Sequence, residues 1–338
     1  MGSAVLTGGS LSLDPAFALA NFGEKGTGIR ALKTIERGSE IISESPFIRF
    51  THPITPLSIR HAWDRLSDEN KQRFLSFTST IPDIDDRFVN IAETNAIPLC
   101  VPSSDESAFD EEHAAAREGV SGMFKTICRV NHSCEPNACW TWSARRQSLT
   151  LRAIRDIPAS SEITASYIDD LTLARDGRQK MLFDNFGFMC CCSSCGNSAE
   201  EVRKSDQNLA RYQELRLRIA EATDVLYKSP GRGGHVHTIL GDVHDAMNIL
   251  EDENRIEAKG ELRMQIIFLY AHTGNRKATV KAAKMALRHF KATIGQEGVR
   301  KTELEEWIRH PDVKSVGCVT VYIDLKCYVL SASVSFAP

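Results

Sequence analysis

The sequence has 338 residues, of which 42% are hydrophobic and 25% are charged, and its net charge at pH 7 is -3. This composition is that of an ordinary soluble globular protein, and the length allows roughly two or three compact units. The small net charge and the lack of a basic tract argue against direct binding of nucleic acid, and Asp324 and Lys326 interrupt the apolar C-terminal stretch, which argues against a membrane span there.

The N-terminal residues 1–21 have no basic residue ahead of their apolar positions, so no secretory signal is expected. Without export, the ten cysteines are better interpreted as thiols and metal ligands than as disulfides. Four of them stand alone in the sequence and are most simply core residues: Cys100, Cys139, Cys318 and Cys327.

Residues 20–50 predict a loop followed by strands. In "FGEKGTGIRALKTI", three glycines come first, and apolar Ile29, Ala31 and Ile35 follow at near-alternate spacing. "IISESPFIRF" predicts a second strand, which Pro46 ends or bends.

The pattern then changes to helical spacing over 56–77, and a mostly charged loop follows over 103–119. Short strands return in "SLTLRAIRDI" (148–157) and "SSEITASYID" (160–169). A brief helix over 172–186 leads into the cysteine-rich stretch "GFMCCCSSCGN".

Beyond residue 200 the apolar residues recur three or four apart, which predicts helices over 209–227, 236–253, 262–274 and 277–295. Gly274 and Gly295 are the expected C-terminal stops of two of them. The spacing in "LYAHTGNRKATVKAAKMAL" is compatible with a tetratricopeptide-type hairpin and equally with a generic helical bundle.

Cys190, Cys192 and Cys195 form C-x-C-x-x-C, a spacing suited to chelation of one zinc ion. Three sulfurs leave the tetrahedron one ligand short, and Cys134 is the best candidate for the fourth. Such a closed sulfur set predicts a structural rather than a catalytic zinc. Three alternatives stay open: a cysteine cluster without metal, Cys191 in place of a neighbour, and Cys128 in place of Cys134.

Four motifs occur in order: "GTG", "NHSCEPN", "EITASYID" and "GFMCCCSSC". With this set the chain resembles the SET-domain protein-lysine methyltransferases over about residues 22–197, particularly the branch of SET-and-MYND enzymes. The resemblance implies an α+β protein: a SET fold of small β-sheets with a threaded C-terminal segment, a post-SET zinc loop and an α-helical C-terminal domain.

The domain limits that we expect are an N-terminal extension (1–21), a SET domain (22–170) with a helical insertion at about 51–120, a post-SET region (171–197), a helical domain (198–312) and a tail of uncertain structure (313–338).

The resemblance also implies roles for individual residues. Tyr167 matches the active-site tyrosine, and Phe186 falls in the lysine channel. The other matched positions would contact S-adenosylmethionine, with Phe188 packing on its adenine: Lys25, Gly26, Thr27, Gly28, Asn95, Asn131, His132 and Phe188.

The chain departs from the family pattern in three places. Residues 51–120 hold no cysteine pair, so the MYND zinc finger is missing from the insertion. "IPASSEIT" lacks the usual glycine of that turn. Phe186 stands where relatives often have a second tyrosine, which leaves open how many methyl groups are added.

The sequence therefore predicts an intracellular protein-lysine methyltransferase of the nucleus or the cytoplasm, with S-adenosylmethionine as cofactor, a structural zinc and a protein substrate. A partner protein on the helical domain is a further expectation. Two other functions were weighed: a non-catalytic SET-fold scaffold, which would have no need of Tyr167, and a thiol redox protein, which would need a basic environment that "CCCSSC" lacks.

Overall fold

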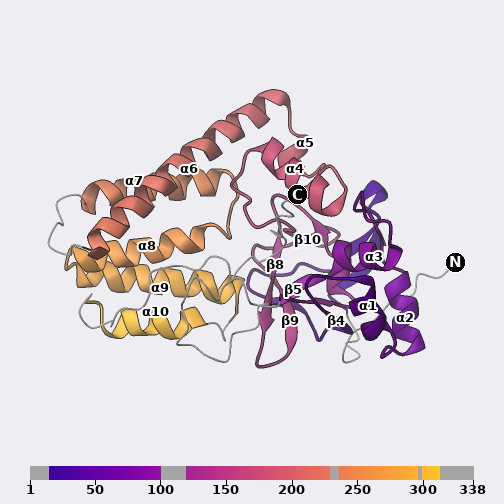
Figure 1. Cartoon of the computed structure of the whole chain (residues 1–338). Helices are drawn as coiled ribbons and strands as arrows, with labels where there is room; N and C mark the ends of the chain where they lie inside the picture. The colour runs from indigo at the N-terminus through magenta and orange to yellow at the C-terminus, as the bar shows by residue number, and fades with distance from the viewer. Residues whose placement is uncertain (1–14, 100–118, 229–235, 296–298, 313–338) are drawn as a thin grey trace. The chain divides into compact units, whose positions relative to one another are not determined.

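The structure is a computed structural model that describes residues 15–99, 119–228, 236–295 and 299–312 (Figure 1). These residues form two compact units, of which the first contains the ten strands and helices α1 to α3, and the second contains helices α6 to α10. Small sheets together with a helical C-terminal region confirm the predicted α+β class.

The first sheet has four strands, and it carries most of the predicted site. Its strands, in order across the sheet, are β1 (Phe17–Asn21), β2 (Thr27–Ala31), β10 (Glu162–Ala165) and β7 (Asn131–His132). All neighbours are antiparallel except β10 and β7, which run parallel.

Strand β1 lies inside the stretch that we expected to be an N-terminal extension. It pairs along its whole length with β2, from Phe17 opposite Ala31 to Asn21 opposite Thr27. Its sequence, "FALAN", has no β-branched residue and only weak alternation, so local propensity gives little sign of a strand. Pairing with β2 supplies what the local sequence does not.

The other two sheets have three strands each. One has the order β3 (Glu40–Glu44), β9 (Ser148–Ala153) and β8 (Ala138–Ser143), and the other has β4 (Ile48–Thr51), β6 (Val120–Met123) and β5 (Ile97–Leu99). Pro46, which has no N–H to donate, separates β3 from β4. Of the two outcomes expected for Pro46, it ends the strand rather than bending it, and the residues after it form a second strand in a different sheet.

Strand alternation explains the shared core of the sheets. In β2, Ile29 and Ala31 are buried, and they are two residues apart. In β10, Ile163 and Ala165 are buried and are also two residues apart. These residues join one apolar cluster with Leu149 and others of β9. The polar residues discussed below stand at the edge of this cluster.

Three short helices form the insertion: α1 (Pro56–Trp63), α2 (Asp68–Leu75) and α3 (Arg87–Asn95). Each begins after a side-chain cap, supplied by Thr55, Ser67 and Asp86 respectively. They bury Phe74 and Ile91 completely in a second core beside β4 and β6. The charged loop predicted over 103–119 lies almost wholly outside the described residues.

The remaining helices are α4 (Arg175–Phe186), α5 (Ser193–Gly196), α6 (Ala199–Lys228), α7 (Val236–Asp252), α8 (Lys259–His272), α9 (Arg276–Thr293) and α10 (Val299–Arg309). Four of them, α6 to α9, confirm the helices predicted beyond residue 200, and the chain leaves α8 and α9 next to Gly274 and Gly295. The tail from 313 lies outside the described residues.

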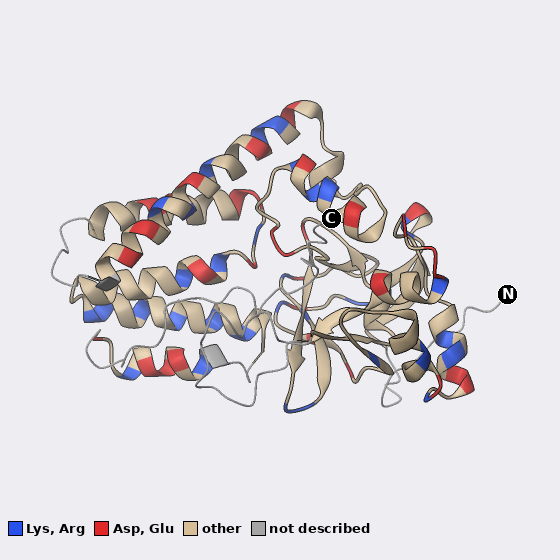
Figure 2. Ribbon diagram, in the orientation of Figure 1, with Lys and Arg blue, Asp and Glu red and all other residues tan. Residues whose placement is uncertain are grey.

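Helix α6 carries charges of both signs along its length (Figure 2), several of them in ion pairs such as Arg211 with Glu214 and Arg218 with Asp242. Among the described residues, none of the helices combines the length and the apolar character that crossing a membrane requires.

Candidate functional site

The stretch "NHSCEPN" is tied to strand β10 by both backbone and side chains. Asn131 and His132 form β7, and they stand opposite Thr164 and Ala165 of β10. Asn137 continues the pairing with its side-chain amide, which donates to the Glu162 carbonyl at 2.8 Å and accepts from the Thr164 N–H at 2.9 Å. A side chain thus replaces backbone where Pro136 would interrupt a strand.

Glu162 connects two predicted cofactor residues. Its carboxylate accepts from the Asn131 amide at 2.8 Å and pairs with the Lys25 ammonium at 2.9 Å. Gly28 lies against the same amide, because a Cβ on Gly28 would sit 2.5 Å from the Asn131 side-chain nitrogen. The glycine loop and "NHSC" therefore meet at Glu162, a residue to which the sequence analysis gave no role.

The Lys25–Gly28 loop also borders open space. Lys25 ends a short 3-10 helix (Gly23–Lys25), Gly26 has a φ of 72°, and Thr27 begins β2. A cavity of about 520 Å³ adjoins Thr27, with Ser76 and Arg129 among its other lining residues. Thr27 alone among the predicted cofactor residues lines this cavity.

His132 links the strand pair to the cysteine cluster. The backbone N–H of Tyr167 donates to His132 Nδ1 at 3.0 Å. Because Nδ1 accepts, the neutral ring carries its proton on Nε2, and that nitrogen lies 3.4 Å from Cys134 Sγ. Both ring nitrogens are engaged within the protein, and His132 is only 4% exposed.

Tyr167 stands among four other rings. Its ring centroid lies 5.1 Å from Phe186, 5.4 Å from His132, 6.2 Å from Phe188 and 6.3 Å from Trp140. Its hydroxyl donates to the Val130 carbonyl at 2.7 Å, which leaves the oxygen lone pairs to accept other hydrogen bonds.

Burial raises the pKa of Tyr167 well above its ordinary value, with the charges of Cys128 and Glu162 adding to the effect. The phenol is therefore protonated at neutral pH, so that it acts as a dipole rather than as a base.

The backbone of Phe186 is held by Thr80, which lies in the segment between α2 and α3. Thr80 Oγ1 donates to the Phe186 carbonyl at 2.7 Å. The next residue, Gly187, has a φ of 70°, and a Cβ there would lie 1.8 Å from the Thr80 carbonyl oxygen. Only glycine fits this position, so the backbone on which the Phe186 ring is mounted is closely fixed.

Asn95 ends helix α3, where its amide nitrogen donates to the carbonyls of Thr78 and Ile91 at 2.7 and 2.8 Å. Its own carbonyl accepts from Cys128 Sγ at 3.2 Å. These contacts brace the Thr78–Thr80 segment that holds Phe186. Its predicted contact with the cofactor stays a prediction.

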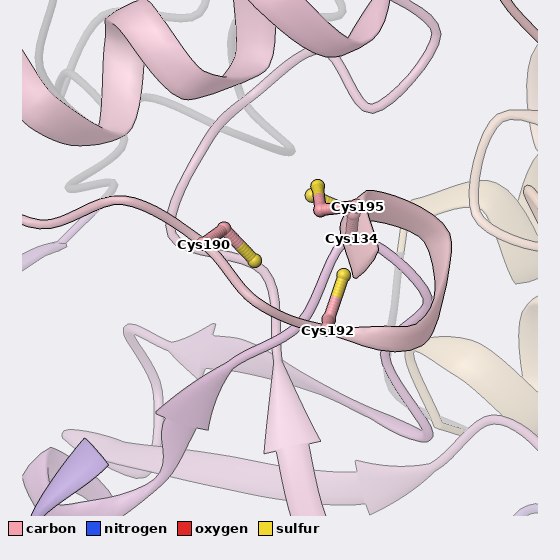
Figure 3. Close-up of side chains that lie close together, drawn as sticks. All are labelled: Cys134, Cys190, Cys192 and Cys195. Atoms are coloured by element: carbon pink, nitrogen blue, oxygen red, sulfur yellow. The ribbon is translucent and has the colours of Figure 1, made fainter. Parts of the chain in front are cut away.

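The four predicted cysteine ligands come together (Figure 3). The sulfurs of Cys134, Cys190, Cys192 and Cys195 all lie within 4.8 Å of one another and all four residues are buried. A zinc–sulfur distance of about 2.3 Å requires sulfurs about 3.8 Å apart in a tetrahedron, so a small contraction completes the site.

The alternative ligands fit less well. Cys191 is exposed and lies outside the cluster. Cys128 hydrogen-bonds with the backbone of Phe124 and Asn95, and burial raises the pKa of its thiol to about 12. A neutral thiol is a poor zinc ligand.

Gln179 fixes the backbone of one cysteine. Its side-chain amide donates to the Cys190 carbonyl and accepts from the Cys190 N–H, both at 2.7 Å. Gln179 and Glu162 are among the site residues that the sequence did not predict. The sequence did offer a signal for each: Gln179 is a polar residue at a buried helix position, and Glu162 is an acidic residue that begins an apolar strand.

Comparison with known proteins agrees with this arrangement. A family model described as "SET domain" matches residues 26–168. The chain is 33% identical over 180 residues to the histone-lysine N-methyltransferase set5 of Schizosaccharomyces pombe, covering 53% of this chain and 50% of that protein.

Two further relatives match shorter segments. The human histone-lysine N-methyltransferase SMYD3 is 32% identical over 118 residues, which is 34% of this chain and 27% of that protein. The human protein-lysine N-trimethyltransferase SMYD5 is 36% identical over 83 residues, 24% of this chain and 20% of that protein.

The chain spans half or less of the length of these relatives. The matched residues 26–168 nevertheless contain the glycine loop, "NHSC" and Tyr167, and the four-cysteine cluster follows in the position of a post-SET zinc site. Residues 26–168 therefore match a SET domain, and the chain is similar to proteins named histone-lysine and protein-lysine methyltransferases.

Proposed function

We propose that the protein is a protein-lysine N-methyltransferase that uses S-adenosylmethionine. The observation that carries this proposal is the position of Tyr167, a half-buried and protonated phenol among Phe186, Phe188, Trp140 and His132. The names of the similar proteins support the same reaction.

Methyl transfer requires that the lysine amine be neutral and that it be oriented toward the methyl group. At an ordinary pKa near 10.4, only about one amine in a few thousand is neutral at pH 7, a cost of about 4–5 kcal/mol. S-adenosylmethionine supplies an electrophilic methyl group on a positively charged sulfonium. An aromatic channel favours the neutral amine by desolvation, and the rings around Tyr167 would provide that environment.

Tyr167 would orient the amine through its oxygen lone pairs, because its O–H is already donated to the Val130 carbonyl. Its negative oxygen end would also favour the partial positive charge on the methyl group as it moves. The rings of Phe186 and Phe188 would limit the directions in which the amine can approach.

The cofactor would contact the residues that meet at Glu162. The ammonium of Lys25 and the amide of Asn131 both contact the Glu162 carboxylate, and Tyr167 lies two residues beyond the end of β10, the strand that Glu162 begins. Asn95, His132 and Phe188 complete the proposed set; for His132 we expect the backbone to make the contact, since its ring nitrogens are engaged.

The substrate would be a protein with an accessible lysine, histone or non-histone. Two of the similar proteins are named histone-lysine methyltransferases, which favours a location in the nucleus or the cytoplasm. Incubation with radiolabelled S-adenosylmethionine and a whole-cell extract should label proteins, and the label should be recovered as methyl-lysine. Recovery on another residue type, or no label at all, would refute the proposal.

Tyr167→Phe should lower turnover about 5- to 150-fold, the equivalent of losing one hydrogen bond worth 1–3 kcal/mol, while the affinity for S-adenosylmethionine changes little. Steady-state kinetics and calorimetry measure the two quantities. The matched control is Tyr212→Phe, which removes a buried phenol of helix α6 and should leave turnover unchanged. Equal turnover of Tyr167→Phe and wild type would make Tyr167 a packing residue.

We also propose that the four-cysteine cluster binds one structural zinc ion, held by Cys134, Cys190, Cys192 and Cys195. Elemental analysis of the purified protein should give close to one zinc per chain.

Cys195→Ser should lose the metal and unfold at a lower temperature, because serine does not replace a thiolate ligand. The neighbouring exposed Cys191→Ser should keep both the zinc and the thermal stability. The site would be disproved by a Cys195→Ser protein that retains full zinc and full stability.

Phe186→Tyr should reduce the number of methyl groups added to one lysine. A phenol at this position, 5.1 Å from the Tyr167 ring, could hydrogen-bond the amine and crowd added methyl groups. Phenylalanine lets a methylated amine rotate and realign, and one similar protein is named a trimethyltransferase.

Mass spectrometry of the product should show di- or trimethyl-lysine from wild type and an earlier stop from the variant. Phe183→Tyr, on the exposed face of α4, serves as the control. Identical product distributions for wild type and Phe186→Tyr would rule this role out.

A further inference from the structure

Two fully buried arginines meet at the loop between the last two cysteines. Arg178 on helix α4 and Arg255, which follows helix α7, are each 1% exposed. Within the part of the chain that the structure describes, they are the two largest side chains that are less than 2% exposed. A guanidinium keeps its charge at any ordinary pH, so its burial is costly unless negative charge or acceptors lie close by.

Both guanidinium groups donate to the same hydroxyl. Arg255 Nη2 lies 3.1 Å and Arg178 Nη2 lies 3.4 Å from Ser194 Oγ, and Ser194 stands between Cys192 and Cys195. Arg178 also comes within 3.9 Å of Cys195 Sγ. Nearby, Arg175 Nε donates to the Cys195 carbonyl at 3.0 Å.

The charges of this group complement those of the proposed metal site. Four thiolates and one Zn²⁺ carry a net charge of -2, since four negative charges meet two positive ones. Arg178 and Arg255 together contribute +2 at the same buried place. Groups just outside the ligands tune metal affinity by orienting the ligands and by balancing their charge.

We propose that Arg178 and Arg255 are positioning residues of the zinc site, which balance the charge of the zinc–thiolate cluster through Cys195 and hold the Cys192–Cys195 loop through Ser194. This inference rests on the proposed zinc site. It gives the helical C-terminal region a direct part in metal binding, because Arg255 comes from the turn between α7 and α8.

The test is the affinity of the full-length protein for zinc, measured by competition with a chromogenic chelator. Arg255→Met keeps the length of the side chain and removes its charge, so the affinity should fall about 10- to 100-fold. Arg255→Lys keeps the charge, and its zinc affinity should lie between that of Arg255→Met and that of wild type. Arg211→Met, an exposed arginine of α6, is the matched control and should match wild type.

Thermal unfolding separates charge balance from simple packing. If the charge matters, adding zinc to metal-free protein should raise the midpoint less in Arg255→Met than in wild type. A role in packing alone would lower the midpoint of Arg255→Met equally with and without zinc and leave zinc affinity unchanged, and that result would overturn the proposal. Loss of affinity in Arg255→Lys as large as in Arg255→Met would also count against charge balance.

Should Arg255→Met fail to fold, Ser194→Ala removes the shared acceptor while leaving both arginines in place. Weaker zinc affinity in Ser194→Ala supports the proposal, and unchanged affinity refutes it. Elemental analysis of wild type distinguishes failure at this level from failure of the site itself, because a protein without zinc would remove the metal site and this inference together. Methyl transfer by wild type would be judged separately.

Discussion

The parallel pairing of β7 with β10 is the constraint on which the site depends. Asn131 and His132 stand opposite Thr164 and Ala165, and the side chain of Asn137 extends the pairing. A slip of one residue would turn each side chain of β7 to the other face. The position of the predicted cofactor residues relative to Tyr167 is therefore set by a strand register, which holds groups more closely than a free loop does.

The same short segment reaches the cysteine cluster. His132 accepts the Tyr167 N–H on one ring nitrogen and lies 3.4 Å from Cys134 Sγ with the other. One imidazole ring therefore connects Cys134 to the backbone of the proposed catalytic tyrosine. On the other side of the cluster, Gln179 fixes the Cys190 backbone. Hydrogen bonds from His132 and from Gln179 thus support two members of the cysteine cluster, and His132 also binds the backbone of Tyr167.

The fold class, the cysteine set and the helices α6 to α9 could be predicted from the sequence, because motif order and apolar spacing are properties of short stretches. It did not reveal Glu162, Gln179 or Arg255, whose roles depend on partners 31, 11 and 61 residues away. Strand β1 was missed for the same reason, since only its pairing with β2 makes it a strand. Long-range contacts of polar residues were the part that local pattern could not give.

The central claim is that the groups meeting at Glu162 form a site for S-adenosylmethionine beside Tyr167. Calorimetric titration of the zinc-loaded protein with S-adenosylmethionine tests it most directly. We predict saturable binding to wild type, and binding weaker by about 1–3 kcal/mol in Asn131→Ala and in Glu162→Ala, each of which removes the Asn131–Glu162 hydrogen bond at 2.8 Å. No heat of binding to folded, zinc-loaded wild type, or equal affinity in all three proteins, would contradict the account.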